Sequence, residues 1–237
     1  MARPRKSYTW WIMGHVLYFL LGLGILLMVL FLLWRIYFSG RLPEEMRGLS
    51  KNDALVAAYA AEGDALELWT QEQSTITKSS ESYGYFSVPR FVYIPSADQL
   101  QLVFRYNNST LEAAKRDFSL ESEPPRGEEV FDVSLLVISD LTPDDQSDNT
   151  DGSENLGQSR IAPTSHTVTT TSLYTYFLYT FDAVEVTEET LVIYFDIYYG
   201  GAVDYGAEPY GTLRVYHKES PREAVRLKRA ELEALAQ

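Results

Sequence analysis

The longest hydrophobic segment of the chain lies near its start. Residues 16–33 are apolar and include no charged residue and no proline. At about 1.5 Å per residue, a helix over this segment covers most of the roughly 30 Å hydrocarbon core of a bilayer. Trp10 and Trp11 precede it, and Trp34 and Tyr37 follow it, where aromatic rings rest at the two membrane interfaces. The pattern predicts one membrane-spanning helix over 12–38 behind a short basic segment at 1–11, with the lipid bilayer as a partner.

A cleaved signal peptide is the alternative interpretation of this segment. The apolar run is longer than the hydrophobic region of a usual signal peptide, and the bulky residues 34–38 include no small-x-small cleavage site. We therefore expect an uncleaved signal-anchor and a single-pass membrane protein.

A polar connector and a short helix follow over 39–65. Residues 53–62 are rich in Ala and Leu, Ser50 stands where a cap is expected, and Gly63 follows as a stop signal. The pattern predicts a juxtamembrane helix that acts as a spacer.

From residue 66 the hydrophobic pattern changes from a helical to an alternating period. One face contains Leu100, Leu102, Phe104 and Tyr106, and the opposite face contains Gln101 and Arg105, as in a strand with one buried side. The same pattern recurs over 131–137 and 191–198, and in weaker form over 68–77, 85–94, 173–186 and 212–216. No helix is expected between these segments, and 187–189 are short enough for a hairpin. The pattern predicts an all-β fold, an antiparallel β-sandwich of about seven strands over 66–217.

Two stretches depart from this alternation. Residues 140–165 are acidic, polar and nearly free of large apolar side chains, so we expect a mobile loop there. Ser220, Pro221 and Glu223 form a helix-start signal with a capping serine and a reciprocal glutamate. An amphipathic C-terminal helix is therefore predicted over 218–237, docked on the sheet or free to bind a partner.

Charge is unevenly distributed. The chain carries 20 Lys and Arg and 33 Asp and Glu, a net charge of −13. Residues 50–217 contain nine basic and 27 acidic side chains, a net charge of −18. A domain of this charge repels nucleic acid and anionic lipid, so no nucleic-acid partner is expected. The chain has no cysteine, which excludes disulfides, thiol catalysis and Cys-ligated zinc.

The charges that flank the apolar segment do not set its orientation, because basic residues stand on both sides of it. The large domain is acidic, thiol-free and rich in Thr, Ser and Tyr. We therefore expect a cytoplasmic N-terminus and an extracellular C-terminal domain in the cell membrane. The reverse arrangement, with a cytosolic domain held under the membrane, is the alternative.

No sequence motif indicates catalysis. The zinc-protease, nucleophile-elbow, P-loop and dinucleotide-binding motifs are absent, so neither a catalytic residue nor a nucleotide partner is predicted. The acidic cluster at 144–154 does not fit an EF-hand, because Ser147 and Gln158 would occupy positions that need acids. A calcium site in that stretch stays open as the alternative. No metal ligand and no cofactor are predicted.

Tyrosine, with 17 copies, is the other unusual feature of the composition. Aromatic rings exposed on a sheet or loop can stack on sugars or anchor a protein partner. Half-buried strand tyrosines are the alternative explanation. The candidate binding residues are Tyr194, Tyr198, Tyr199, Tyr205 and Tyr210.

The first functional hypothesis is a non-enzymatic, membrane-anchored β-sandwich displayed at the cell surface, which binds an unknown protein or glycan. The alternatives are a membrane-tethered hydrolase of envelope material that uses two carboxylates, and an accessory subunit of a larger membrane complex. Overlapping glycosylation sequons at Asn107 and Asn108 have a function only in a eukaryotic secretory pathway.

Overall fold

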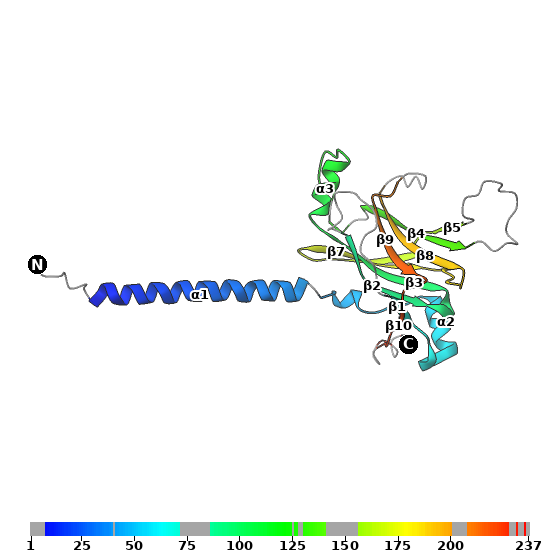
Figure 1. The fold of residues 1–237 in the computed structure, drawn as a ribbon, viewed down its shortest axis with the longest axis horizontal. Coiled ribbons are helices and arrows are strands. Elements are labelled where there is room, and N and C mark those ends of the chain that lie inside the picture. The colour runs from blue at the N-terminus through cyan, green and yellow to red at the C-terminus, as the bar shows by residue number, and fades with distance from the viewer. Residues whose placement is uncertain are drawn as a thin grey trace, which may run out of the picture. The chain divides into compact units, whose positions relative to one another are not determined.

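A computed structural model shows one long helix followed by a β-domain (Figure 1). The chain divides into two units, Met1–Leu42 and Pro43–Gln237. The residues that the structure describes are 8–39, 41–71, 86–124, 126–127, 130–140, 156–200, 208–227, 231 and 235.

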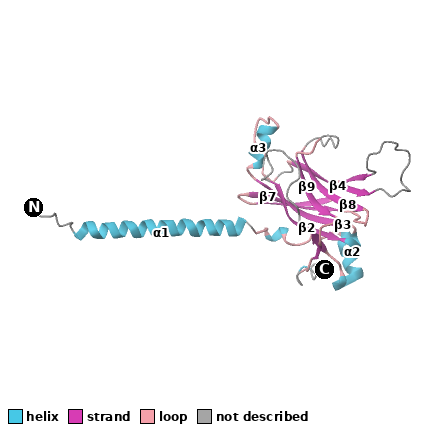
Figure 2. Ribbon diagram, in the orientation of Figure 1, coloured by secondary structure: helices cyan, strands magenta, loops and turns pink. Residues whose placement is uncertain are grey.

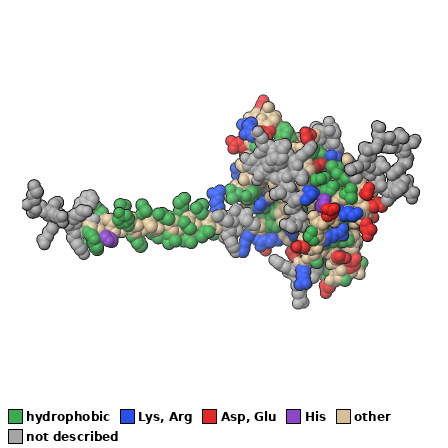
Figure 3. Space-filling view, in the orientation of Figure 1, with side chains coloured by type: hydrophobic (Ala, Val, Ile, Leu, Met, Phe, Trp, Pro, Cys, Tyr) green, Lys and Arg blue, Asp and Glu red, His purple; other side chains and the backbone are tan. Residues whose placement is uncertain are grey.

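Helix α1 (Tyr8–Ser39) forms the first unit. Its segment Trp11–Arg35 is long and apolar enough to cross a membrane, a property that a signal sequence shares. Hydrophobic side chains cover the helix on the face that Figure 3 shows, whereas acidic and basic side chains are interspersed over the β-domain. Trp11 and Trp34 are exposed near the two ends of the apolar segment. Trp10 and Tyr37 lie within the helix, and their side chains are outside the described part of the chain.

The β-domain contains two antiparallel sheets (Figure 2). The six-stranded sheet has the order β10-β1-β2-β3-β7-β6, and the four-stranded sheet has the order β5-β4-β8-β9. The strands are β1 (Trp69–Gln71), β2 (Phe86–Ile94), β3 (Gln99–Asn107), β4 (Phe131–Asp140), β5 (Leu156–Ile161), β6 (Ser165–Thr170), β7 (Tyr174–Phe181), β8 (Thr190–Tyr199), β9 (Gly211–His217) and β10 (Arg222–Ala224).

One core of alternating side chains joins the inner faces of the two sheets. Leu100, Leu102 and Phe104 of β3 are fully buried in it, together with Phe195 of β8. The predicted antiparallel β-fold is confirmed, and the core that the two sheets share supports the predicted sandwich. The predicted number of strands was too low, because β5, β6 and β10 lie outside the segments assigned to strands.

The connector after α1 packs against the six-stranded sheet. Two short 3-10 helices, η1 (Glu44–Met46) and η2 (Gly63–Ala65), flank helix α2 (Asp53–Glu62). Met46 and Leu55 are completely buried, and Leu55 packs with Val92 and Ile94 of β2. Residues 43–65 therefore form part of the β-domain unit.

The cap of α2 differs from the prediction. The side-chain oxygen of Asn52 accepts a hydrogen bond of 2.9 Å from the Leu55 amide, so Asn52 caps the helix. Ser50 instead exchanges two backbone hydrogen bonds with the side chain of Gln101, at 2.7 and 2.8 Å. The helix ends at Gly63, whose φ of 58° is the left-handed conformation that favours glycine.

Two connections differ from the structures that the sequence suggested. Residues 182–189 lead from β7 in the six-stranded sheet to β8 in the four-stranded sheet, so 187–189 do not join two paired strands. The predicted loop at 140–165 contains β5, which pairs with β4 from Leu135↔Ile161 to Asp140↔Leu156. Residues 141–155 of that prediction lie outside the described residues.

The predicted start of a C-terminal helix at Ser220 is wrong. Residues Arg222–Ala224 form β10, which pairs antiparallel with all three residues of β1. The Arg222 guanidinium lies 4.7 Å from the ring centroid of Trp69 and donates a 3.0 Å hydrogen bond to the Tyr216 hydroxyl. Pairing with the free edge of β1 outweighs the local capping signal, because tertiary hydrogen bonds and ring contacts are gained together. Of the last ten residues the structure describes Glu231 and Leu235, and both are helical.

Gln71 fixes the turn between β9 and β10. Its side-chain nitrogen donates to the carbonyl oxygens of His217 and Ser220 at 2.9 and 2.7 Å, and its oxygen accepts from the His217 amide at 2.8 Å. The side chain is almost completely buried. Loss of this side chain would remove three hydrogen bonds to the backbone, although the His217 carbonyl would still accept from the Ser220 amide at 3.0 Å.

We predict that Gln71→Ala lowers the free energy of unfolding by about 2–3 kcal/mol, because buried backbone groups lose their hydrogen bonds. The matched control is Gln158→Ala on the exposed surface of β5, which should change it by less than about 0.5 kcal/mol. Urea unfolding in detergent solution, followed by near-ultraviolet circular dichroism, measures both variants. Equal effects of the two substitutions would contradict the role of Gln71.

Candidate functional site

The structure separates the predicted binding tyrosines into two groups. Tyr199 and Tyr210 both contact Phe118 at the end of the sandwich that carries helix α3 (Thr110–Asp117), opposite the end that carries α2 (Figure 1). Tyr194 and Tyr198 project from the outer face of the four-stranded sheet. Tyr205 lies outside the described residues.

Three aromatic residues form what we call the aromatic end surface, namely Phe118, Tyr199 and Tyr210. The rings of Phe118 and Tyr199 stack with centroids 4.0 Å apart and an angle of 15° between their planes. The rings of Phe118 and Tyr210 are 5.1 Å apart. Phe118 is 36% exposed, and the two tyrosines are half-buried. The three rings therefore present a contiguous and partly accessible aromatic surface.

Core residues hold this surface from behind. The Tyr210 ring is parallel to the Phe131 ring at 5.8 Å and meets the Phe86 ring edge-on at the same distance. The Tyr210 hydroxyl donates a 2.9 Å hydrogen bond to a carboxylate oxygen of Asp117. Both ends of the tyrosine side chain are thereby positioned before any partner arrives.

Helix α3 places Phe118 and Asp117 in this arrangement. Leu111 and Ala114 are fully buried on one side of the helix, which docks it on the end of the sheet. Phe118 is the C-terminal cap, and its amide bonds to the Ala114 carbonyl at 2.9 Å. The backbone of Ser119 then takes a positive φ of 53°, which ends the helix.

Helix α3 corrects the expectation that no helix separates the strands. The helix has eight residues and lacks a side-chain cap, so its signal is weak beside the strong alternation of β3 and β4. Two features of the sequence could have identified this helix. Leu111 and Ala114 have the spacing of one helical face, and the basic residues Lys115 and Arg116 lie in the last turn. Because this helix was not predicted, Phe118 at its end was not among the predicted site residues.

A second group of side chains lies on the outer face of the four-stranded sheet, and we call it the Arg160–Asp196 cluster. The Arg160 guanidinium donates to a carboxylate oxygen of Asp196 at 2.9 Å and to the Tyr198 hydroxyl at 2.6 Å. The other oxygen of Asp196 accepts a 2.9 Å hydrogen bond from the Thr212 hydroxyl. Strands β5, β8 and β9 thus contribute to a single polar network.

This cluster is closed to solvent at its centre. The side chain of Asp196 is 3% exposed and that of Arg160 is 29% exposed. Burial raises the pKa of the Tyr198 hydroxyl, and the nearby Asp196 carboxylate acts in the same direction, while Arg160 lowers it. Tyr198 is only 5% exposed, so it does not present the accessible ring that the sequence suggested. Tyr194 is half-buried on the same face.

Two further tyrosines, on strand β7, share the outer face of the six-stranded sheet. Tyr174 and Tyr176 have ring centroids 6.0 Å apart, and Tyr176 is buried. The Arg105 guanidinium lies 4.6 Å from the Tyr174 ring centroid and donates from Nε to the Ser87 hydroxyl at 2.8 Å. These rings are structural parts of the sheet.

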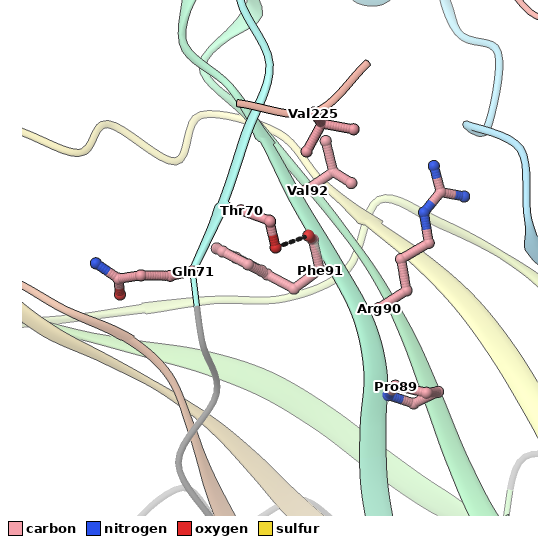
Figure 4. Close-up of a pocket in the computed structure, with 7 residues that line it drawn as sticks. All are labelled: Thr70, Gln71, Pro89, Arg90, Phe91, Val92 and Val225. Carbon is pink, nitrogen blue, oxygen red and sulfur yellow. Dashed lines mark hydrogen bonds between the residues drawn. The ribbon is translucent and has the colours of Figure 1, made fainter. Parts of the chain in front are cut away.

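An open hollow of about 420 Å³ lies where β1 and β2 diverge (Figure 4). The Thr70 hydroxyl donates across it to the Phe91 carbonyl at 2.6 Å. Burial lowers the pKa of Arg90 on its wall, while Glu231 acts in the opposite direction. The side chain of Arg90 donates to the Arg47 and Gly48 carbonyls and thereby holds the connector after α1. The hollow is lined by Thr70, Gln71, Pro89, Arg90, Phe91, Val92 and Val225.

Two other candidate sites from the sequence are the acidic cluster and the glycosylation sequons. Among the described residues, no group of three His, Asp or Glu side chains is arranged to hold a metal ion, and the acidic residues at 144–154 lie outside that part of the chain. The Asn108 amide is buried, donates to the Thr171 carbonyl and accepts from the Thr175 hydroxyl, each at 2.9 Å. The Asn107 oxygen accepts from the Ser109 amide at 3.1 Å, so turn hydrogen bonding accounts for this sequon residue.

We predict that Arg160→Met destabilises the protein by about 2–3 kcal/mol, because it leaves the buried Asp196 carboxylate without its cation. The double variant R160M/D196L should recover at least half of that loss. Arg116→Met is the matched control, because the Arg116–Asp117 pair spans 3.2 Å but its arginine is 70% exposed; it should cost less than about 0.5 kcal/mol. Urea unfolding provides the free energies, and a double variant as unstable as R160M would contradict the argument.

Comparisons with known proteins complete the description of the site. No model of a protein family matches the chain, and neither a curated protein nor a solved structure matches it. The function is therefore inferred from the geometry of these side chains.

Proposed function

We propose that this chain is a single-pass membrane protein that displays its β-sandwich at the cell surface, where the aromatic end surface binds a protein or glycan partner. The observation that carries the proposal is the stack of Phe118 on Tyr199 beside Tyr210, with Phe118 36% exposed. The proposal assigns no catalytic step to the domain.

The rigidity of the three rings supports a role in binding. Aromatic side chains offer a large contact area for few rotatable bonds, so a partner gains contact at a small entropic cost. The stack on Phe131 and the hydrogen bond to Asp117 hold Tyr210 in one orientation. Preorganised aromatic residues of this kind are enriched among the residues that dominate binding energy.

The negative charge of the β-domain limits the charge that a partner can carry. Residues 50–217 carry a net charge of −18, and Asp117 places a carboxylate at the aromatic end surface. This charge favours a basic or neutral partner over an anionic one. A neutral glycan can stack on the rings and hydrogen-bond to Asp117, and a protein can pack an apolar or basic side chain against them.

Membrane display rests on α1 and on the composition of the domain. Trp11–Arg35 is a helix long and apolar enough to cross a membrane, so a bilayer is the environment that suits its side chains. An acidic, cysteine-free domain rich in Thr, Ser and Tyr suits the exterior of the cell. The proposed orientation is a cytoplasmic N-terminus, an uncleaved anchor and an external β-domain.

We predict that Phe118→Ala lowers partner binding at least tenfold and costs little stability, because the ring is stacked but a third exposed. The full chain in nanodiscs serves as bait for a detergent extract of its own membranes and for a panel of neutral glycans. Tyr194→Ala is the matched control, since that half-buried tyrosine lies outside the aromatic end surface. If both variants capture the same partners as the unaltered chain in equal amounts, the aromatic end surface is not the binding site.

We predict the orientation from single cysteines in this cysteine-free chain. On intact cells, a membrane-impermeant maleimide should label Gln158→Cys on exposed β5 and should label Ser7→Cys only after permeabilisation. The inverse pattern would show a cytosolic domain. Loss of Ser7→Cys from the mature chain, measured by mass spectrometry, would show a cleaved signal peptide.

A further inference from the structure

Strand β6 is the terminal strand of the six-stranded sheet. Among the described strands it pairs only with β7, from Ser165↔Thr180 to Thr170↔Thr175. Five of its six residues are exposed, and the Val168 side chain is 39% exposed. A row of backbone groups on the side away from β7 is therefore placed to pair with another strand.

The hydrogen-bond pattern identifies which residues face outward. The Thr171 amide donates to the Tyr174 carbonyl at 2.8 Å, which makes these two residues a hydrogen-bonded pair across the hairpin. Because such pairs alternate along an antiparallel ladder, the backbone groups of Thr169 and Thr167 also point toward β7. The backbone groups of Thr170 and Val168 point away from it.

β6 differs from the other edge strands in its charge. Proteins commonly protect free edges with charged residues, proline or a bulge in the strand. The other terminal strands carry Arg160 on β5, Arg214 on β9, and Arg222 with Glu223 on β10. β6 has the sequence SHTVTT, without Lys, Arg, Asp, Glu or Pro, and its Thr and Val residues favour extended structure.

We propose that β6 pairs antiparallel with β6 of a second copy of this chain, about a twofold axis at Val168. This register places Val168 opposite its own copy and Thr167 opposite Thr169 of the other chain. It brings the outward backbone groups of the two strands together and joins the two six-stranded sheets into one continuous sheet.

The distribution of charge leaves the β6 edge as a place where two copies can meet. Two domains that each carry a net charge of −18 over residues 50–217 repel one another over most of their surfaces. The β6 edge has no acid to oppose an acid in the other copy, and twofold pairing places only Val, Thr, Ser and His side chains against one another. The charged residues on β5, β9 and β10 oppose further edge pairing, so the assembly closes at two chains.

The absence of cysteine makes this proposal directly testable. Residues of a hydrogen-bonded antiparallel pair have Cα atoms about 5.5 Å apart, within the range that a disulfide spans. Full-length Val168→Cys, oxidised in its membranes, should form disulfide-linked dimers on a non-reducing gel. Ser159→Cys, exposed on edge strand β5, is the matched control and should form at least fivefold fewer. Equal yields for the two variants would overturn the proposal, as would crosslinking of Val168→Cys solely to a different protein.

A charge swap tests the register. In the V168C background, T167K/T169K places lysine opposite lysine across the pair and should abolish the crosslink. The acidic version, T167E/T169E, should do the same. Coexpression of the two should restore a heterodimer, because each lysine then faces a glutamate. Thermal unfolding shows whether each variant is folded. Folded variants that crosslink as well as V168C alone, or a mixture that does not recover, would exclude this pairing.

Discussion

The packing of aromatic rings around Phe104 holds the two sheets together, and the candidate surfaces depend on it. The Phe104 ring lies 5.3 Å from that of Phe195 in the opposite sheet and 5.8 Å from that of Phe86 in its own. The chain has no cysteine, so burial of apolar side chains must supply the cohesion that disulfides provide in many external domains. Phe86 and Phe131 also contact Tyr210, which makes the aromatic end surface an outward extension of the core.

The outer faces of the two sheets are covered in different ways, and this difference decides which polar residues are accessible. Residues 43–62 pack over the six-stranded sheet, where Gln101 is buried beneath Ser50. On the four-stranded sheet, Arg160 covers Asp196 and Tyr198 with its own side chain. Tyr198 is therefore enclosed in a satisfied network, while Tyr199, the next residue, turns inward and extends to the end of the sandwich.

The aromatic end surface and the β6 edge offer different kinds of interaction, so each can bind its partner independently of the other. Ring stacking at Phe118 offers apolar contact area, which is insensitive to salt. The β6 edge offers backbone hydrogen bonds, whose geometry requires a second extended strand. The β6 edge carries no Lys, Arg, Asp or Glu, whereas the aromatic end surface has the Asp117 carboxylate beside it. The negative charge of the domain disfavours unspecific association elsewhere on the surface.

The sequence by itself determined the features that repeat locally. The unbroken apolar run identified α1, the alternation of Leu100 to Tyr106 identified β3, and the same period identified β4 and β8, because burial of one face imposes a period of two on a strand. Tertiary structure alone decided the features that depend on distant partners. Arg222–Ala224 form a strand because the edge of β1 is available for pairing. Asn52, in place of Ser50, caps α2, because Gln101 binds the backbone of Ser50. Phe118 contacts Tyr199 and Tyr210 because α3 docks at their end of the sandwich. These choices rest on contacts between residues far apart in the chain, and no local pattern encodes such contacts.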